Sequence, residues 1–205
     1  MLFIYRFLIN LTIIFLPIIG IYRIIKGKEN INSIKEKFGF YTKYNKGKLI
    51  WFHGSSVGEI MSVIPLIQEL EKNKKINKIL ITSNTLSSSK IIPKFKFKKT
   101  IHQFYPIDHI YFTNKFLKYW RPNLAIFIES EIWPCMYKNI YNYNIPLILL
   151  NARLTKKTFN RWIKIKYFSK SIFNKILIAY PQNIETKKFL KKINPQKIKI
   201  LGNLK

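Results

Sequence analysis

The sequence predicts an α/β fold, a Rossmann-like parallel sheet that follows a hydrophobic N-terminal membrane helix. Two observations predict it. Short apolar runs alternate with helical patterns from residue 49 onwards, and the preceding segment Leu2–Ile25 is almost entirely apolar. Short strands that alternate with helices form right-handed βαβ units, and such units build a parallel sheet. The 205 residues suffice for one domain with a substantial core.

Seven apolar runs mark the expected strands, at residues 49–52, 79–82, 103–105, 124–128, 147–150, 176–179 and 198–201. Helical patterns between them cover about residues 58–72, 87–92, 108–120, 133–143, 157–173 and 185–192. Prolines fall at the boundaries, with Pro106 after one strand, Pro122 before another and Pro146 at the start of a third. We therefore expect a Rossmann-like domain over residues 49–205.

Residues 1–27 are expected to form a membrane anchor helix. No charge occurs between Phe7 and Tyr22, and basic residues flank this stretch (Arg6, Arg23, Lys26 and Lys28). A spanning helix needs about 20 apolar residues, and arginines that extend toward the interface can lengthen a shorter one. No small-residue cleavage site follows, so the segment should be retained. A spanning anchor and an embedded interfacial helix both fit, and a buried core helix is the alternative.

A basic connector at residues 28–48 joins the anchor to the domain. It contains a short helical pattern at residues 34–38, a turn at Gly39 and several lysines (Lys35, Lys37, Lys43, Lys46 and Lys48). Positive residues beside a membrane segment favour the cytoplasmic side. We therefore expect the domain on that side of a single N-terminal anchor.

The charge balance is extreme, with 37 Lys+Arg against nine Asp+Glu and a formal net charge of +28. Such a balance suggests nucleic acid, an anionic membrane or a phosphorylated substrate as partner. The lysines are spread along the whole chain, which indicates an overall compositional bias more than one selected patch. The sequence has no zinc-finger spacing, RNP-type motif or arginine-rich arm, so we do not expect a nucleic-acid partner.

Cysteine and histidine give no sign of a metal site. Cys135 is the single cysteine of the sequence, which excludes an intrachain disulfide. His53, His102 and His109 do not fall at metal-ligand spacing with it, and each is expected to be structural or solvated.

Glu59 is the first candidate catalytic residue. The stretch 50–59 reads as a buried strand, a turn of small residues and the start of a helix. Open parallel sheets bind their ligands at the carboxyl ends of the strands, where Glu59 should lie. It could be a general base beside that crevice. It could also simply favour the helix N-terminus, a contribution of about 0.3–1 kcal/mol.

Further polar residues follow the other predicted strands. Glu129 and Glu131 come directly after residues 124–128, Arg153 follows the next strand, and Lys205 follows the last. Glu131 could instead cap a helix, and Arg153 could fix the carboxylates or hold an acidic substrate. The hydroxyl-rich loop at residues 82–89 could bind a polar ligand or cap a helix. All these groups are expected at one edge of the sheet.

Several nucleotide and hydrolase motifs are missing from the sequence. It has no Gly-x-Gly-x-x-Gly and no Gly-x-x-x-x-Gly-Lys-Ser/Thr, which disfavours a dinucleotide enzyme or a P-loop NTPase. It also has no Gly-x-Ser-x-Gly nucleophile elbow.

A set of short motifs carries a family resemblance. They are His-Gly-Ser-Ser-Val-Gly-Glu (53–59), Ile-Pro-Leu-Ile (64–67), Glu-Ser-Glu-Ile-Trp-Pro (129–134), Ile-Pro-Leu (145–147), Asn-Ala-Arg-Leu (151–154) and Gly-Asn-Leu-Lys (202–205). In this order and spacing the chain resembles the lipid A-specific 3-deoxy-D-manno-octulosonic acid (Kdo) transferases of lipopolysaccharide synthesis, glycosyltransferase family 30. The resemblance runs along essentially the whole chain, although Gly54 and Ser55 replace bulkier residues common in the first motif.

The resemblance implies an inverting GT-B enzyme at the cell inner membrane that transfers Kdo from CMP-Kdo to the lipid A precursor, lipid IVA. It implies no cofactor and no metal. By motif position, Glu59 corresponds to the proton acceptor, and Glu129 and Lys205 correspond to residues that stabilise the transition state. Ser56, Gly58, Glu131 and Arg153 are the expected substrate-binding residues. The implied partners are CMP-Kdo, the lipid A precursor and the anionic membrane.

Members of this family are longer and carry a second domain that supplies most of the donor site. We therefore expect this chain to be the N-terminal, acceptor-side half, with the C-terminal donor-binding domain absent. It would be a truncated or split enzyme, the latter working with a separately encoded C-terminal domain. The alternative is a catalytically inactive remnant that binds the membrane surface or lipid A.

Overall fold

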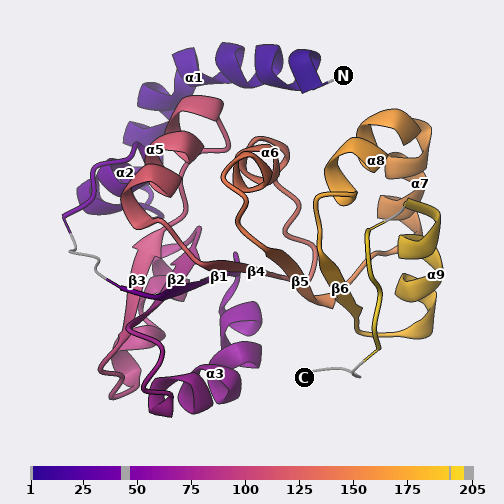
Figure 1. The fold of residues 1–205 in the computed structure, drawn as a ribbon. Helices are drawn as coiled ribbons and strands as arrows, with labels where there is room; N and C mark the ends of the chain where they lie inside the picture. Colours follow the sequence, from indigo (N-terminus) through magenta and orange to yellow (C-terminus); the bar gives the residue numbers. More distant parts are fainter. Residues whose placement is uncertain (1, 43–46, 194, 201–205) are drawn as a thin grey trace.

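The computed structural model describes residues 2–42, 47–193 and 195–200. In this part of the chain six parallel strands form one sheet in the order β3-β2-β1-β4-β5-β6 (Figure 1). The strands are β1 (Leu49–His53), β2 (Lys78–Ser83), β3 (Thr100–Phe104), β4 (Leu124–Ile128), β5 (Leu147–Ala152) and β6 (Ile178–Pro181). This Rossmann-like order confirms the predicted fold class.

Helices cover both faces of the sheet, and Figure 1 shows α3 on the opposite side from α5 and α6. Their bounds are α1 (Leu2–Ile25), α2 (Ile31–Lys37), α3 (Val57–Lys72), α4 (Leu86–Ser89), α5 (Ile110–Trp120), α6 (Pro134–Asn142), α7 (Lys156–Lys164), α8 (Lys166–Phe173) and α9 (Ile184–Ile193), with a 3-10 turn η1 (Ile92–Lys94).

Side chains that alternate along the strands build two cores. Trp51 of β1 packs with Phe116 of α5 and Phe127 of β4 on one face of the sheet. Its neighbour Phe52 packs on the other face, in a cluster that includes Ile60 of α3. Successive residues of a strand point to opposite faces, so the apolar runs predicted for central strands supply both cores.

The structure corrects several of the predicted boundaries. The third strand spans Thr100–Phe104 instead of 103–105, because polar residues begin this edge strand. The predicted helix 157–173 is two helices that meet at Ile165. The last predicted strand, 198–201, runs partly outside the described residues, and its described part forms a single parallel bridge between Ile198 and Ala179.

Strand β3 lies at one end of the sheet, and two carboxylates accept hydrogen bonds from it. Glu36 of α2 accepts from the backbone N–H of Phe104 at 2.8 Å. Glu71 of α3 accepts from the backbone N–H of Lys99 at 3.0 Å and from the hydroxyl of Thr100 at 2.6 Å. A donor at each end of β3, the Phe104 N–H and the Thr100 hydroxyl, therefore has a carboxylate partner within the chain.

Helix α1 is long and apolar enough to cross a membrane, by length and composition. None of its residues, all of which are described, is fully buried. One stripe is half-buried, with Tyr5, Ile9, Leu16 and Gly20 facing the domain. The opposite face is exposed, with Phe3 at 79 % and Ile14 at 70 % of their full exposure. The buried-core alternative for this segment is therefore wrong.

Both ends of α1 are bonded to polar groups near the domain. The Tyr5 hydroxyl donates to buried Asp108 at 2.7 Å. Arg23 pairs with buried Glu29 at 3.2 Å, and Lys37 of α2 pairs with the same carboxylate. Asp108 also accepts from two backbone N–H groups at the start of α6, at Cys135 and Met136. The helix therefore lies along the domain, as Figure 1 shows.

Candidate active site

The candidate site lies where the strand order reverses, at the carboxyl ends of β1 and β4. From β1 the chain proceeds through β2 and β3 in one direction, and β4 then pairs on the other side of β1. Ligands of open parallel sheets bind at such a reversal. Residues 53–59 follow β1 here, and residues 129–133 follow β4.

Glu59 lies in the first turn of α3. The hydroxyl of Ser56, the N-cap of α3, accepts from the Glu59 N–H at 3.2 Å. The Glu59 carboxylate reaches back and accepts from the Ser55 N–H at 2.7 Å through Oε2. The arrangement resembles a capping box, with the carboxylate bonded one residue earlier. Gly54 permits it, since a Cβ there would lie 3.1 Å from the Glu59 Cβ.

The pKa of Glu59 is raised by burial, and the nearby charges of Glu131 and Glu129 raise it further. Hydrogen bonds from Ser55 and Ser56 act in the opposite direction without cancelling the effect. A carboxylate with a raised pKa is a better proton acceptor near neutral pH than an ordinary glutamate.

Glu131 has a different environment. Burial alone would raise its pKa, but hydrogen bonds from His53, Ser55 and Trp133 lower it below the usual value. Its Oε2 lies 3.1 Å from His53 Nε2, 2.5 Å from Ser55 Oγ and 2.8 Å from Trp133 Nε1. Three donors on one oxygen keep this carboxylate ionised and fixed.

His53 is fully buried and ties Glu131 to the sheet. Its Nε2 faces the carboxylate, while Nδ1 lies 3.0 Å from the Thr82 hydroxyl and 3.2 Å from the Thr82 carbonyl. Its ring stacks on Tyr105 with 3.8 Å between the ring centroids. His53 is structural, as the sequence predicted.

Glu129 has a left-handed backbone. Its φ is +57°, and Asn151 near the end of the neighbouring β5 has a φ of +52°. Both residues are buried, with Glu129 at 7 % exposure. Non-glycine residues in this conformation cost about 1–3 kcal/mol each and concentrate at functional sites. Asn151 belonged to a quoted motif but was not predicted as a site residue.

The other predicted binding residues lie around the same edge. Ser56 and Gly58 are exposed, and a Cβ added to Gly58 would meet nothing within 4 Å. Arg153 is exposed, and its backbone N–H donates to the Glu129 carbonyl at 3.3 Å. The structure thus brings Ser56, Gly58, Glu59, Glu129, Glu131 and Arg153 to one edge. Lys205 lies outside the described residues.

The hydroxyl-rich loop after β2 reaches the site through contacts with Ser55 that the sequence did not predict. The Asn84 amide donates to Ser55 Oγ at 2.7 Å, and the Ser88 hydroxyl donates to the Ser55 carbonyl at 3.2 Å. Thr85 caps α4, which confirms the capping interpretation for part of this loop. Ser55 therefore connects the loop, Glu131 and Glu59. The hydroxyl-rich composition was the signal in the sequence, but no spacing rule identifies its partner.

The described residues indicate neither a metal site nor a reactive cysteine. In the described ranges no group of three His, Cys, Asp or Glu side chains is placed to hold a metal ion. Burial raises the pKa of the Cys135 thiol to about 12, so this thiol remains protonated at neutral pH.

The fold and the carboxylate edge define a class of protein, the Rossmann-like α/β domains that bind ligands at the carboxyl ends of their strands. UDP-N-acetylglucosamine 2-epimerase has a similar fold, with a TM-score of 0.54 and 15 % identity over 78 % of this chain and 47 % of that one. The same values apply to the UDP-GlcNAc 2-epimerase of Neisseria meningitidis bound to UDP-GlcNAc. These likenesses show the fold alone.

Sequence comparison identifies the family. Residues 32–205 match the family described as 3-Deoxy-D-manno-octulosonic-acid transferase (kdotransferase), and the chain belongs to this family of glycosyltransferases.

Several curated relatives carry the name of this family. The 3-deoxy-D-manno-octulosonic acid transferase of Rickettsia felis is 45 % identical over 67 % of this chain and 30 % of the relative. That of Rickettsia bellii is 38 % identical over 85 % and 43 %, and that of Haemophilus influenzae is 29 % identical over 88 % and 43 %. The chain spans less than half the length of these relatives.

Proposed function

We propose that this chain forms the acceptor side of an enzyme that transfers Kdo from CMP-Kdo to the lipid A precursor, lipid IVA. The observation that supports this most strongly is Glu59, a carboxylate with a raised pKa at the reversal of strand order. Its Oε2 is held by the Ser55 N–H. Among the described residues none donates to Oε1, which is therefore available to a substrate hydroxyl.

In the proposed reaction, a hydroxyl oxygen of lipid IVA attacks the anomeric carbon of Kdo as the bond to CMP breaks. Glu59 takes the hydroxyl proton, and CMP leaves with the bonding electron pair. Attack opposite to the leaving group inverts the anomeric carbon. The opposed pKa shifts of Glu59 and Glu131 suit this division of roles, because one carboxylate accepts a proton while the other stays ionised.

The other residues have proposed roles that follow their positions. Glu129 stabilises positive charge that develops on the sugar, because it is buried beside the same edge. Glu131 orients the turn through Ser55 and contributes to acceptor binding. Ser56 and Gly58 present the open first turn of α3, where backbone N–H groups favour an anion. Arg153 offers a cation to an acidic substrate, and Lys205 is proposed to stabilise the departing phosphate.

We further propose that the protein works on the cytoplasmic side of the cell inner membrane. Support comes from α1, whose exposed apolar face fits the hydrocarbon boundary of a leaflet. Basic residues near its end and in the connector favour the anionic cytoplasmic surface. The acceptor is a phosphorylated glycolipid of the same membrane.

The test is CMP release from CMP-Kdo with lipid IVA in detergent micelles. This chain is assayed alone and mixed with the separately expressed C-terminal half of the Rickettsia bellii relative. Glu59→Gln should reduce the rate by about 10²–10⁴-fold, the usual contribution of a general base. Glu69→Gln is the matched control, because Glu69 is exposed on the same helix.

CMP release by the mixture, but not by this chain on its own, supports a split enzyme. If the chain binds lipid IVA but neither arrangement releases CMP above the Glu59→Gln level, the catalytic role fails and the inactive binding remnant is the better description.

A further inference from the structure

A cavity of about 360 Å³ lies between α1 and the carboxyl edge of the sheet. The α1 stripe that includes Tyr5, Ile9 and Leu16 forms one wall. The segment after β3, at Tyr105, Pro106 and Ile107, forms the other. This volume is in the range of small-molecule binding pockets.

The two carboxylates at the cavity already have hydrogen-bond partners within the chain. Asp108 accepts from Tyr5 and from two backbone N–H groups of α6. Glu29 accepts from Arg23, Ser33 and Lys37. Polar groups that already have partners need no further polar ligand, so they do not require a polar occupant of the cavity. The surface left to an occupant is therefore mainly hydrocarbon and aromatic.

The lining of the cavity includes residues from most of the length of α1. Its lining reaches from Tyr5 to Arg23, about 27 Å along a helix that rises 1.5 Å per residue. One leaflet of a bilayer has a hydrocarbon depth of about 15 Å, half of the usual core. A single acyl chain from a leaflet therefore fits along this cavity.

The inner end of the cavity adjoins the candidate active site. Trp133 and Asn84 line it, and Trp133 Nε1 donates to Glu131 at 2.8 Å. Asn84 donates to Ser55, whose N–H holds Glu59. An occupant of the cavity thus lies within a few hydrogen bonds of the proposed base.

We propose that this cavity binds one acyl chain of the glycolipid acceptor and so places its sugar hydroxyl beside Glu59. The inference rests on the proposed function and names how that substrate is held. The exposed outer face of α1 contacts the leaflet, and the cavity lies beneath the same helix. A chain can therefore pass from the membrane under α1 while its phosphorylated head group stays at the sheet edge. Continuity with the site favours the acceptor over a bulk phospholipid.

The test uses two photoreactive probes in anionic vesicles with the full chain. One is lipid IVA with a diazirine at the end of an acyl chain, and the other is phosphatidylglycerol with the same chain. Cross-linked peptides are identified by mass spectrometry. We expect the lipid IVA probe to label Tyr105–Ile107, and both probes to label the exposed α1 face around Ile14 and Ile18.

Ile107→Trp fills the cavity and should lower labelling of this segment by at least about tenfold, because a chain loses affinity with each methylene that leaves the pocket. Ile18→Trp, on the exposed face of α1, should leave it unchanged. Leu16→Trp fills the cavity from the other wall and replaces Ile107→Trp if that variant fails to fold.

Equal labelling in the filled variants, or equal labelling by phosphatidylglycerol, would overturn the proposal. Cross-linking requires binding but no catalysis, so its result can be interpreted even if the CMP-release assay is negative. Transfer of Kdo without labelling of Tyr105–Ile107 would contradict the cavity proposal and leave the proposed function intact.

Discussion

Glu59 and Glu131 lie at the same sheet edge, and their surroundings shift their pKa values in opposite directions. Burial and two neighbouring carboxylates raise the pKa of Glu59, whereas donors from His53, Ser55 and Trp133 outweigh burial and lower that of Glu131. Ser55 contacts both groups, through its N–H and its hydroxyl. Opposed shifts of this kind are the pattern of an acid–base site, and they also affect folding stability.

Glu59→Gln should relieve a cost of folding at neutral pH. Because the folded pKa of Glu59 is raised, its contribution favours folding at low pH and is lost as the pH rises through the folded pKa. The free energy of unfolding of Glu59→Gln, relative to wild type, should therefore increase from about pH 4 to about pH 7. Urea unfolding at both pH values measures this. A difference independent of pH would contradict the raised pKa.

Glu131→Gln should show the opposite trend. The lowered pKa of Glu131 gives stability that is present above its unfolded pKa and is lost as the pH falls through the folded value. We expect a loss of about 1–3 kcal/mol at neutral pH, because the amide is a weaker acceptor for three donors. The loss should diminish as the pH falls below about 4.3, the ordinary pKa of a glutamate, toward the lowered folded value. Exposed Glu69→Gln should change stability by less than about 0.5 kcal/mol at any pH.

Residue positions at the site were predictable where strand order alone decides them. Glu59, Glu129 and Glu131 follow apolar runs, so their shared edge could be inferred before the fold was known. The bonds among them could not, because His53 and Glu131 are 78 residues apart. The left-handed backbone of Glu129 likewise has no local sequence signal. The roles of all seven predicted site residues remain predictions.

At the scale of elements, α1 is attached to the domain by few polar contacts. Tyr5→Phe removes the hydroxyl that donates to buried Asp108 at 2.7 Å. Removing a partner of a buried charged group costs about 1–3 kcal/mol. We expect faster hydrogen exchange in α1 and in the first turn of α6, where Asp108 also accepts N–H bonds. Tyr22→Phe, at an exposed position of the same helix, should leave exchange unchanged.

Central elements were easier to predict than peripheral ones. The buried strand β4 has its predicted bounds of Leu124–Ile128, because an apolar run between turn residues is distinctive. The edge strand β3 begins three residues earlier than expected, since Thr100 and His102 carry polar side chains. The division between α7 and α8 falls at Ile165, where φ is −115° and ψ is 48°, although the helical pattern there contains no glycine or proline.

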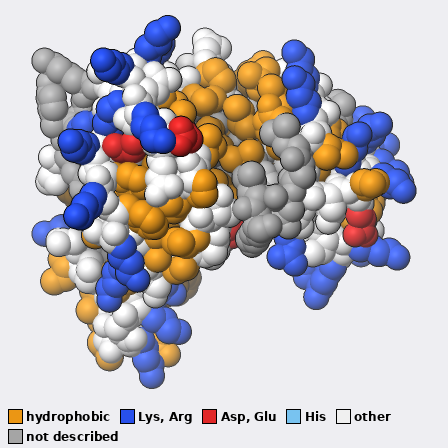
Figure 2. All heavy atoms as spheres, turned by 90° about the horizontal axis from the view of Figure 1, so that it is seen from below, with side chains coloured by type: hydrophobic (Ala, Val, Ile, Leu, Met, Phe, Trp, Pro, Cys, Tyr) orange, Lys and Arg blue, Asp and Glu red, His pale blue; other side chains and the backbone are white. Residues whose placement is uncertain are grey.

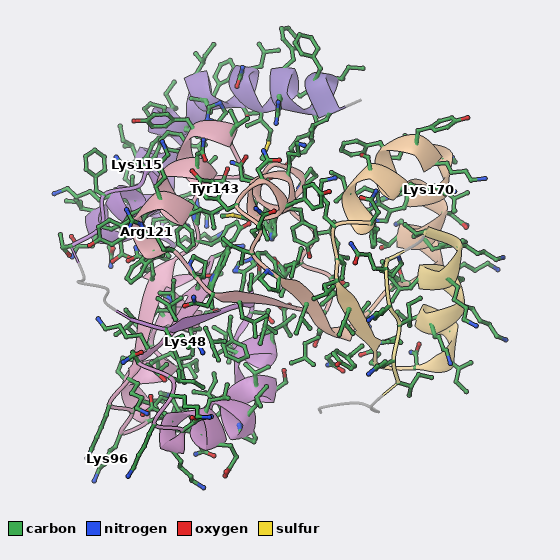
Figure 3. The ribbon with its side chains drawn as sticks, viewed as in Figure 1. Lys48, Lys96, Lys115, Arg121, Tyr143 and Lys170 are labelled. Atoms are coloured by element: carbon green, nitrogen blue, oxygen red, sulfur yellow. The ribbon has the colours of Figure 1, made fainter. Side chains whose placement is uncertain are left out.

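At the scale of the whole molecule, positive charge is widely distributed. Figure 2 shows Lys and Arg side chains around the rim of one face, with hydrophobic side chains gathered toward its centre. Lys96, Lys115 and Lys170 come from three separate parts of the chain in Figure 3. The distribution agrees with an overall compositional bias. It still gives the molecule a net charge of +28 and an attraction to any anionic surface.

Removal of residues 1–28 should separate the two sources of membrane binding. The shortened chain should bind anionic vesicles through lysines alone, each worth about 1 kcal/mol near the surface. An increase from about 0.05 M to about 0.5 M salt should release it, because screening shortens the reach of charge. The intact chain should stay bound through the apolar face of α1. Vesicle sedimentation measures both, and release of the intact chain by salt would contradict an apolar anchor.

The carboxylates along β3 affect how the molecule meets copies of itself. An edge strand with open N–H groups is a template on which another chain can add a strand. Here Glu36 occupies the Phe104 N–H and Glu71 occupies the Lys99 N–H and the Thr100 hydroxyl. Of the nine acidic residues in a strongly basic chain, two thus serve the edge of the sheet. These two carboxylates thus leave fewer open donors on the β3 edge for a strand of another copy to bind.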